Sequence, residues 1–213
     1  GWPRIIIGLF LLSLFIAAPF VGVRLDASLS DTLVRVGMNG VLVLAMVPMV
    51  QSGCGLNFGL PLGIIAGLLG AVTSIQIGIT GGIGFLIAMA IAVPLAVVFG
   101  WMYGQLLNRV KGDEMMIATY VGFSSVALMC MAWLLLPYTS PTMIWGYGGS
   151  GLRTTISVEG FWLNALSKYL HIQIGQFFYI PVGMYLFFGL MVFLVWGFFR
   201  TKTGTAITAV GSN

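Results

Sequence analysis

Residues 85–104 read FLIAMAIAVPLAVVFGWMYG and contain no charged side chain. An α-helix needs about 20 apolar residues to cross the hydrocarbon core of a bilayer, because each residue adds only about 1.5 Å along the helix axis. A strand of a membrane β-barrel would instead alternate apolar with polar residues, and this stretch is continuously apolar. The stretch therefore predicts a transmembrane helix.

The same pattern recurs along the whole chain, which has 213 residues, of which 59% are hydrophobic and 7% are charged. A water-soluble domain of this size could not cover so much apolar surface with so few charges. Five further apolar runs are long enough to span a bilayer, at residues 5–23, 33–50, 60–77, 115–136 and 179–199. We therefore expect an all-α polytopic membrane protein of about six transmembrane helices, one of them broken or glycine-rich, in a single domain over residues 1–213.

Positive charges beside these runs predict the orientation in the membrane. Six spans place both termini on one side, and cytoplasmic loops carry an excess of Lys and Arg. The terminal side carries Arg4, Arg109, Lys111, Arg200 and Lys202, and the opposite side carries Arg24, Arg153 and Lys168. Both termini are therefore expected in the cytoplasm. The net charge of +4 comes from a few loop residues, and no basic run predicts nucleic-acid binding.

Few side chains suggest enzymatic or metal chemistry. Cys54 and Cys130 both lie in apolar runs, where a thiol behaves as a small hydrophobe, so neither a disulfide nor a metal site is expected. Arg35 lies near the outer end of the second run and can extend to the interface, with Asp31 as a candidate partner. No charged side chain lies in the centre of a run, which argues against a proton-coupled carrier.

The longest segment between apolar runs, residues 137–178, falls on the outer side. Within it, residues 158–170 carry apolar side chains at helical spacing, which predicts a short helix lying on the membrane surface. Such a helix would serve either as an aromatic cap at the interface or as a docking surface for an external protein.

Glycines recur at every fourth position from residue 55 onward. Gly55, Gly59, Gly63 and Gly67 would lie on one face of a helix, where small residues allow a neighbouring backbone to approach closely. These four glycines are therefore predicted to be helix-packing residues.

Polar residues lie beside these glycines, between Pro48 and Pro61. Because Pro removes a helical hydrogen bond and disfavours a helical residue before it, this segment forms either a broken helix beside a translocation pathway or a tight cytoplasmic turn between two spans. Gln51 and Asn57 are candidate substrate-pathway residues, since amides can both donate to and accept from a polar solute. Asn39 is a third candidate, although it would serve equally as a hydrogen-bonding contact between helices.

Three stretches, in this order, resemble the permease subunits of bacterial ABC importers for simple sugars, nucleosides and branched-chain amino acids. They are MNGVLVLAMVPMVQSGCGLNFG at 38–59, GQLLNRVKGDEMMIATYVGFSSVALM at 104–129 and FFRTKTGTAITAVGSN at 198–213. The third is the most specific, since it is similar to a family run of the form R-T-x-x-G-x-x-x-x-A-x-G-x-N. The turn at Asn57 is similar to the nucleoside type of the family, but the sequence departs from that type near Pro61.

The resemblance implies a membrane-spanning subunit of an ATP-driven importer in a bacterial inner membrane, carrying a small polar solute such as a simple sugar or a nucleoside. It implies three partners: an ABC ATPase subunit, an extracytoplasmic solute-binding protein and a second permease copy or paralogue. The ATPase would bind ATP, so this chain is expected to be no enzyme and to hold no cofactor or metal. Family members continue beyond the third stretch, so the chain is expected to be the N-terminal part of a longer domain. The residues implied to face the ATPase are Arg200, Lys202, Gly204, Gly211 and Asn213.

Two other classes of function remain open. A passive channel or a non-transporting scaffold subunit would share the packed glycines and the uncharged span centres. An intramembrane serine protease would need Ser150 and the only histidine, His171, within hydrogen-bonding distance at a protected site, and both residues lie in the outer segment.

Overall fold

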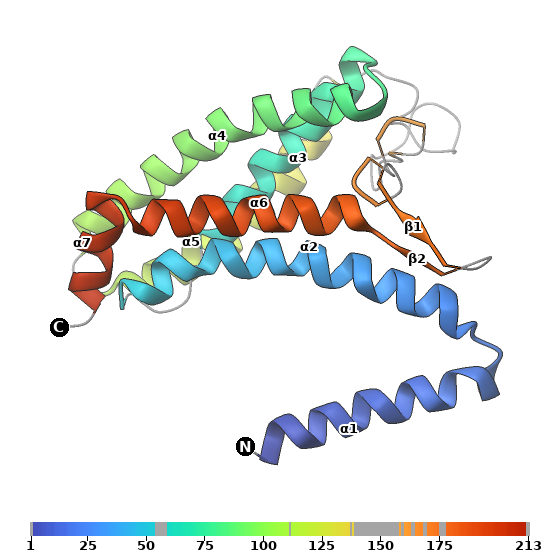
Figure 1. The fold of residues 1–213 in the computed structure, drawn as a ribbon. Coiled ribbons are helices and arrows are strands. Elements are labelled where there is room, and N and C mark those ends of the chain that lie inside the picture. The colour runs from blue at the N-terminus through green and yellow to red at the C-terminus, as the bar shows by residue number, and fades with distance from the viewer. Residues whose placement is uncertain are drawn as a thin grey trace. The chain divides into compact units, whose positions relative to one another are not determined.

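The structure is a computed structural model, shown as a ribbon in Figure 1. It describes residues 2–53, 59–110, 112–136, 138, 158, 160–162, 165–167, 170–174 and 178–211. The elements in chain order are α1 (Trp2–Ala17), the 3-10 turn η1 (Ala18–Val21), α2 (Leu25–Gln51), α3 (Leu60–Ile77), α4 (Gly81–Arg109), α5 (Glu114–Leu135), β1 (Ile172–Gln173), β2 (Tyr179–Ile180), α6 (Val182–Phe199) and α7 (Lys202–Gly211).

The described part of the chain contains six helical segments that are long and apolar enough to cross a membrane. They are Trp2–Val21, Leu25–Gln51, Leu60–Ile77, Gly81–Arg109, Glu114–Ala132 and Val182–Phe199. The predicted all-α polytopic fold is therefore confirmed. The spans α2 and α4 are longer than their apolar runs, with 27 and 29 residues, because helical hydrogen bonding continues into polar residues that lie beyond the hydrocarbon core.

The prolines do not interrupt these spans. Pro48 lies inside α2, which continues to Gln51, and Pro61 lies in the first turn of α3, where its missing N–H has no helical acceptor in any case. Helices α2 and α3 are thus two complete spans on either side of the segment that holds Asn57. Both alternatives for the segment between Pro48 and Pro61 stay predictions, because residues 54–58 lie outside the described residues. Asn57 itself lies outside the described residues.

The chain forms two compact units, one made of residues 1–41 and 166–192 and the other of residues 42–165 and 193–213. Helices α2 and α6 contribute residues to both. Within the first unit, helix α1 has no buried residue, so its apolar surface is exposed all round. Strands β1 and β2 form a short antiparallel hairpin that pairs Ile172 with Ile180 and leads directly into α6.

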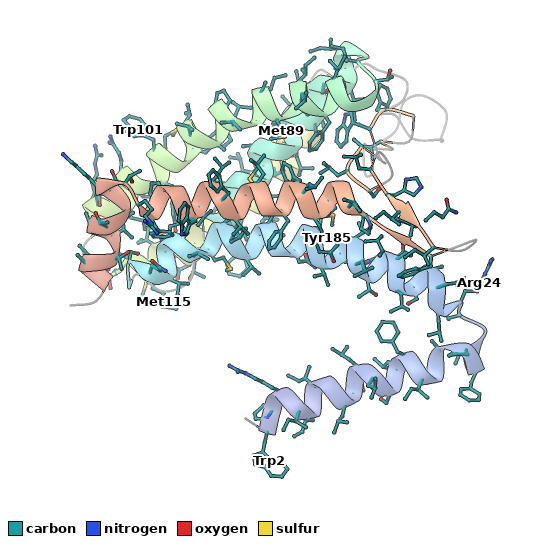
Figure 2. All side chains as sticks on the ribbon, viewed as in Figure 1. Trp2, Arg24, Met89, Trp101, Met115 and Tyr185 are labelled. Atoms are coloured by element: carbon teal, nitrogen blue, oxygen red, sulfur yellow. The ribbon has the colours of Figure 1, made fainter. Side chains whose placement is uncertain are left out.

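In the first unit, α2 packs against β2 and α6 through small and polar residues at helical spacing. The Tyr179 N–H donates to the buried Ser30 Oγ at 3.0 Å, and the Tyr185 hydroxyl donates to the Leu33 carbonyl at 3.1 Å. Figure 2 shows Tyr185 between the two helices. One turn further, a Cβ at Gly37 would lie 2.6 Å from Met184 Cγ. The absence of a side chain at this glycine therefore permits the close approach of α6.

In the second unit, α3 and α4 lie side by side as an antiparallel pair (Figure 1). A Cβ at Gly70 would lie 2.5 Å from the Ala88 carbonyl oxygen and 2.8 Å from Ala92 Cβ, so the two backbones are almost in contact there. The Ser74 hydroxyl, which is buried, donates to the Gly84 carbonyl at 2.7 Å. Small-residue packing and an interhelical hydrogen bond, the two devices that join helices in lipid, both act on this pair.

The described residues between α5 and β1 contact one end of the α3–α4 pair. Phe161 and Trp162 pack with the buried Val72 and Ile75 of α3, and the Gly81 N–H donates to the Phe161 carbonyl at 2.7 Å. The surface helix predicted for residues 158–170 is wrong where the chain is described, since residues 160–162 and 165–167 form turns. Gly160 has a φ of +85°, which a right-handed helix cannot accommodate, and the aromatic side chains that follow it pack against α3.

Candidate functional site at the α2–α7 junction

Helix α7 follows α6 after a sharp turn that Thr201 and Gly204 make together. Thr201 occupies the N-cap position of α7, where its hydroxyl oxygen accepts from the Gly204 N–H at 3.3 Å. The same hydroxyl donates to the Phe198 carbonyl at 2.6 Å, so it joins the end of α6 to the start of α7. A Cβ at Gly204 would overlap the Phe198 carbonyl oxygen, which explains why a glycine stands at this buried position.

The far end of α7 contacts the end of α2. The Thr208 hydroxyl lies 3.3 Å from Gln51 Oε1 and 3.1 Å from the Gly204 carbonyl, and its single proton can be donated to either oxygen. Gly211 lies directly against the backbone of Gln51 and Ser52, and a Cβ at Gly211 would overlap the Gln51 carbonyl oxygen. No side chain therefore separates α7 from the last turn of α2.

The chain leaves α2 through a second glycine at the same contact. Gly53 has a φ of +76°, and a Cβ built on it would lie 3.5 Å from the Gly211 Cα. A positive φ is readily available only to glycine, so the turn that follows Gln51 requires this residue type. Two glycines from distant parts of the sequence thus meet where α2 ends and α7 ends.

Two cations lie at the start of α7. The Arg200 guanidinium carbon is 4.5 Å from the centroid of the Trp196 ring, a cation–π contact that holds the charge at the end of α6. Lys202 is the first residue of α7 and is exposed. Exposed basic residues beside an aromatic ring at the end of a span are typical of a membrane interface.

The structure brings together some of the residues singled out in the sequence and separates others. Gln51 and Gly211 meet at the junction, with Gly204 in the turn that precedes it. Asn39 is exposed on α2, more than three helical turns before Gln51, and its side chain forms no hydrogen bond to any described residue. Gly55, Asn57 and Asn213 lie outside the described residues.

Two of the remaining glycines of the predicted packing face, Gly63 and Gly67, have no close neighbour among the described residues. Gly59 precedes the first turn of α3, and no described atom lies within 4 Å of a Cβ built at Gly63 or Gly67. Their packing role stays a prediction. Within the described part of the chain, α4 approaches α3 most closely at Gly70, about one helical turn beyond Gly67.

Thr208 and Tyr103 were not predicted as site residues from the sequence, and Thr201 was indicated only as part of the family-like run at 200–213. Thr201 directly precedes the first residue of α7, and threonine is a preferred N-cap residue, so this cap could have been predicted from the sequence. Tyr103 of α4 is buried, and its hydroxyl has no hydrogen-bond partner among the described residues. A buried, unpartnered hydroxyl is costly, so it marks a position where another molecule could supply the missing contact.

Comparison of the chain with protein-family models, with curated proteins and with solved structures gave no match in any of the three. The junction is therefore interpreted from its own geometry alone. Chemically, the junction offers an amide, two hydroxyls and exposed cations, and among the described residues no group of three or more His, Cys, Asp or Glu side chains could hold a metal ion.

Proposed function

We propose that this chain is the membrane-spanning subunit of an ATP-driven importer that carries a small polar solute, such as a simple sugar or a nucleoside, by alternating access. In this proposal it works with a separate ATPase subunit, a second permease chain and an extracytoplasmic solute-binding protein in a bacterial inner membrane. Both chain termini, and with them α7, face the cytoplasm. The six apolar spans and the resemblance of three stretches to this permease class support the proposal.

The observation that carries the proposal is the contact of Gly211 with the Gln51 backbone. A permease without its own energy source must pass motion from a partner to its solute pathway. Helix α7 presents Arg200 and Lys202 at one end and lies against the end of α2 at the other. Because Gly211 has no side chain that could give way, a displacement of α7 would move Gln51 and the connection that carries Asn57.

Solute contacts in this proposal come from amide and hydroxyl groups. Gln51 and Asn57 would act at the α2–α3 connection, and Asn39 lies on the exposed surface of α2. The unpartnered Tyr103 hydroxyl is a further candidate, since it can both donate to and accept from a sugar hydroxyl.

The test compares Gly211→Ala with Val210→Ala. Val210 neighbours Gly211 on α7 and is 71% exposed, so its truncation is a matched control that leaves the junction intact. Cells that differ only in this chain are assayed for uptake of labelled ribose and labelled adenosine, before and after depletion of ATP. The added methyl group overlaps the Gln51 carbonyl, and overpacking of about 1–3 kcal/mol corresponds to a loss of roughly five- to 150-fold in uptake.

Uptake that requires ATP, is lost in Gly211→Ala and is retained in Val210→Ala supports the proposal. Uptake that continues at the same rate after ATP depletion would overturn it in favour of a passive channel. Equal uptake by the two variants would show that the contact of Gly211 with Gln51 does not transmit motion from α7 to the solute pathway. The amount of each variant in the membrane is measured in parallel, so that a loss of uptake is not confused with a loss of protein.

A further inference from the structure

A groove of about 470 Å³ lies along the first three turns of α2, away from the junction. Its polar lining consists of Arg24, Ser28, Asp31, Thr32 and Arg35. These residues recur at intervals of three and four, so they form a single stripe on one face of the helix. The three charged side chains are exposed, and the two hydroxyl residues between them are half-buried.

The opposite face of the same helical segment is already occupied. Ser30 is fully buried and accepts from the Tyr179 N–H, and the Leu33 carbonyl accepts from the Tyr185 hydroxyl. The polar stripe is therefore not the face that α2 uses to pack against β2 and α6. Its charged groups point away from the face of α2 that contacts β2 and α6.

The length of α2 places this stripe at the membrane interface. With 27 residues, α2 is about 40 Å long, which is roughly 10 Å more than the hydrocarbon core of a bilayer. Arg35 is the last charged residue of the helix, and residues 36–51 are uncharged. The surplus length therefore falls at the start of α2, where lipid headgroups lie.

The charges in the groove are of both signs and are one helical turn apart. Among the described residues no ion pair joins Asp31 to Arg35, although side chains at this spacing are neighbours on a helix. Arg35 offers a planar set of N–H donors that matches a phosphate group. Asp31 offers a carboxylate that accepts from an ammonium group, and the Ser28 and Thr32 hydroxyl oxygens lie along the same stripe.

We propose that this groove binds a phosphate group linked to a primary ammonium group, as in phosphatidylethanolamine or in soluble phosphoethanolamine. The phosphate lies on Arg35, and the ammonium donates to Asp31. A phosphatidylglycerol headgroup has the phosphate but no cation for Asp31. A phosphatidylcholine headgroup has the cation but no N–H to donate. The proposal concerns a different face from the junction and does not depend on the transport function.

Native mass spectrometry of the detergent-purified chain tests this assignment with three lipids of identical acyl chains: phosphatidylethanolamine, phosphatidylglycerol and phosphatidylcholine. We expect the unmodified chain to retain phosphatidylethanolamine about fivefold more than either other lipid, the preference that one net hydrogen bond from the ammonium to Asp31 supplies. Asp31→Asn removes the preference, Asp31→Glu keeps it, and Arg35→Gln lowers retention of all three lipids. Arg109→Gln is the matched control, because Arg109 is an exposed arginine at the end of another span.

An excess of soluble phosphoethanolamine then distinguishes the two sources of the ligand. If it displaces the bound lipid, the groove accepts a free solute, and if it does not, the acyl chains are needed and the ligand is a lipid. Equal retention of the three lipids by the unmodified chain would overturn the proposal. So would an unchanged preference in Asp31→Asn, since the carboxylate is the group that distinguishes the headgroups.

Discussion

Substitution of Gly70 by alanine tests the close contact between α3 and α4. A Cβ at this position would lie 2.5 Å from the Ala88 carbonyl oxygen, 2.8 Å from Ala92 Cβ and 2.9 Å from the Ala92 nitrogen, whereas ordinary contact begins at 3.4 Å. Two of these three atoms belong to the α4 backbone and cannot rotate away. The helices would therefore have to separate by most of an ångström, which would also stretch the 2.7 Å hydrogen bond from Ser74 to Gly84.

The expected cost follows from a comparison within the same helix. Gly67→Ala places the same methyl group where no described atom lies within 4 Å. Both substitutions replace a helical glycine by alanine, so they share the same gain of about 1 kcal/mol in helix propensity, and their difference isolates the contact with α4. Overpacking of a close contact costs about 1–3 kcal/mol, which corresponds to a melting temperature about 2–12 °C lower for Gly70→Ala than for Gly67→Ala.

Thermal unfolding in detergent, followed by the loss of the monodisperse chromatographic peak, measures this difference. Gly63→Ala serves as a second control, because this glycine also has no described neighbour within 4 Å. If Gly70→Ala melts together with the two controls, α4 does not limit the space at Gly70, and the close approach of the two helices is refuted. If Gly67→Ala is as destabilised as Gly70→Ala, a second contact surface lies on the Gly67 side.

Two further predictions concern the contact of α2 with β2. Ser30→Ala removes the acceptor of the Tyr179 N–H at a fully buried position, so we expect a loss of about 1–3 kcal/mol and faster hydrogen exchange at the Tyr179 amide; unchanged exchange would contradict this. Burial, and secondarily the Asp31 carboxylate, raise the pKa of the Tyr179 phenol above its usual value of 10.0. The unfolded chain then releases this proton at a lower pH than the folded chain, so the free energy of unfolding should fall as the pH rises above 10.0. Asp31→Asn should reduce this fall without abolishing it. An identical alkaline loss of stability in the variant would exclude the Asp31 carboxylate as a cause of the raised pKa.

The spans could be predicted from the sequence because hydrophobic length is a local property. The runs at 60–77 and 85–104 each lie within one observed helix, α3 and α4. The ends of the helices could not be predicted equally well. Helix α4 begins at Gly81, before its apolar run, and ends at Arg109, after it, since helical hydrogen bonding continues past the ends of the run.

The contacts between segments depended on information that the sequence pattern does not contain. The four-residue spacing pointed to Gly63 and Gly67, but the direction from which α4 arrives selects Gly70, and that direction is set by the turn that joins α3 to α4. The contact of Gln51 with Thr208 joins residues 157 positions apart. The segments that carry Gln51 and Thr208 can each be recognised in the sequence, whereas the contact between them depends on the tertiary fold.

The two helix pairs also differ in when they can form during synthesis. The α3–α4 contact joins neighbouring segments, for example Ser74 and Gly84, so both partners reach the membrane almost together. The contact of α2 with β2 and α6 joins Ser30 to Tyr179, 149 positions later, so the face of α2 that carries Ser30 has no partner from this pair until β2 and α6 have been synthesised. Because contacts distant in sequence form late, the hairpin that carries Tyr179 closes the first compact unit late in synthesis, and the contact of α7 with Gln51 in the second unit forms after it.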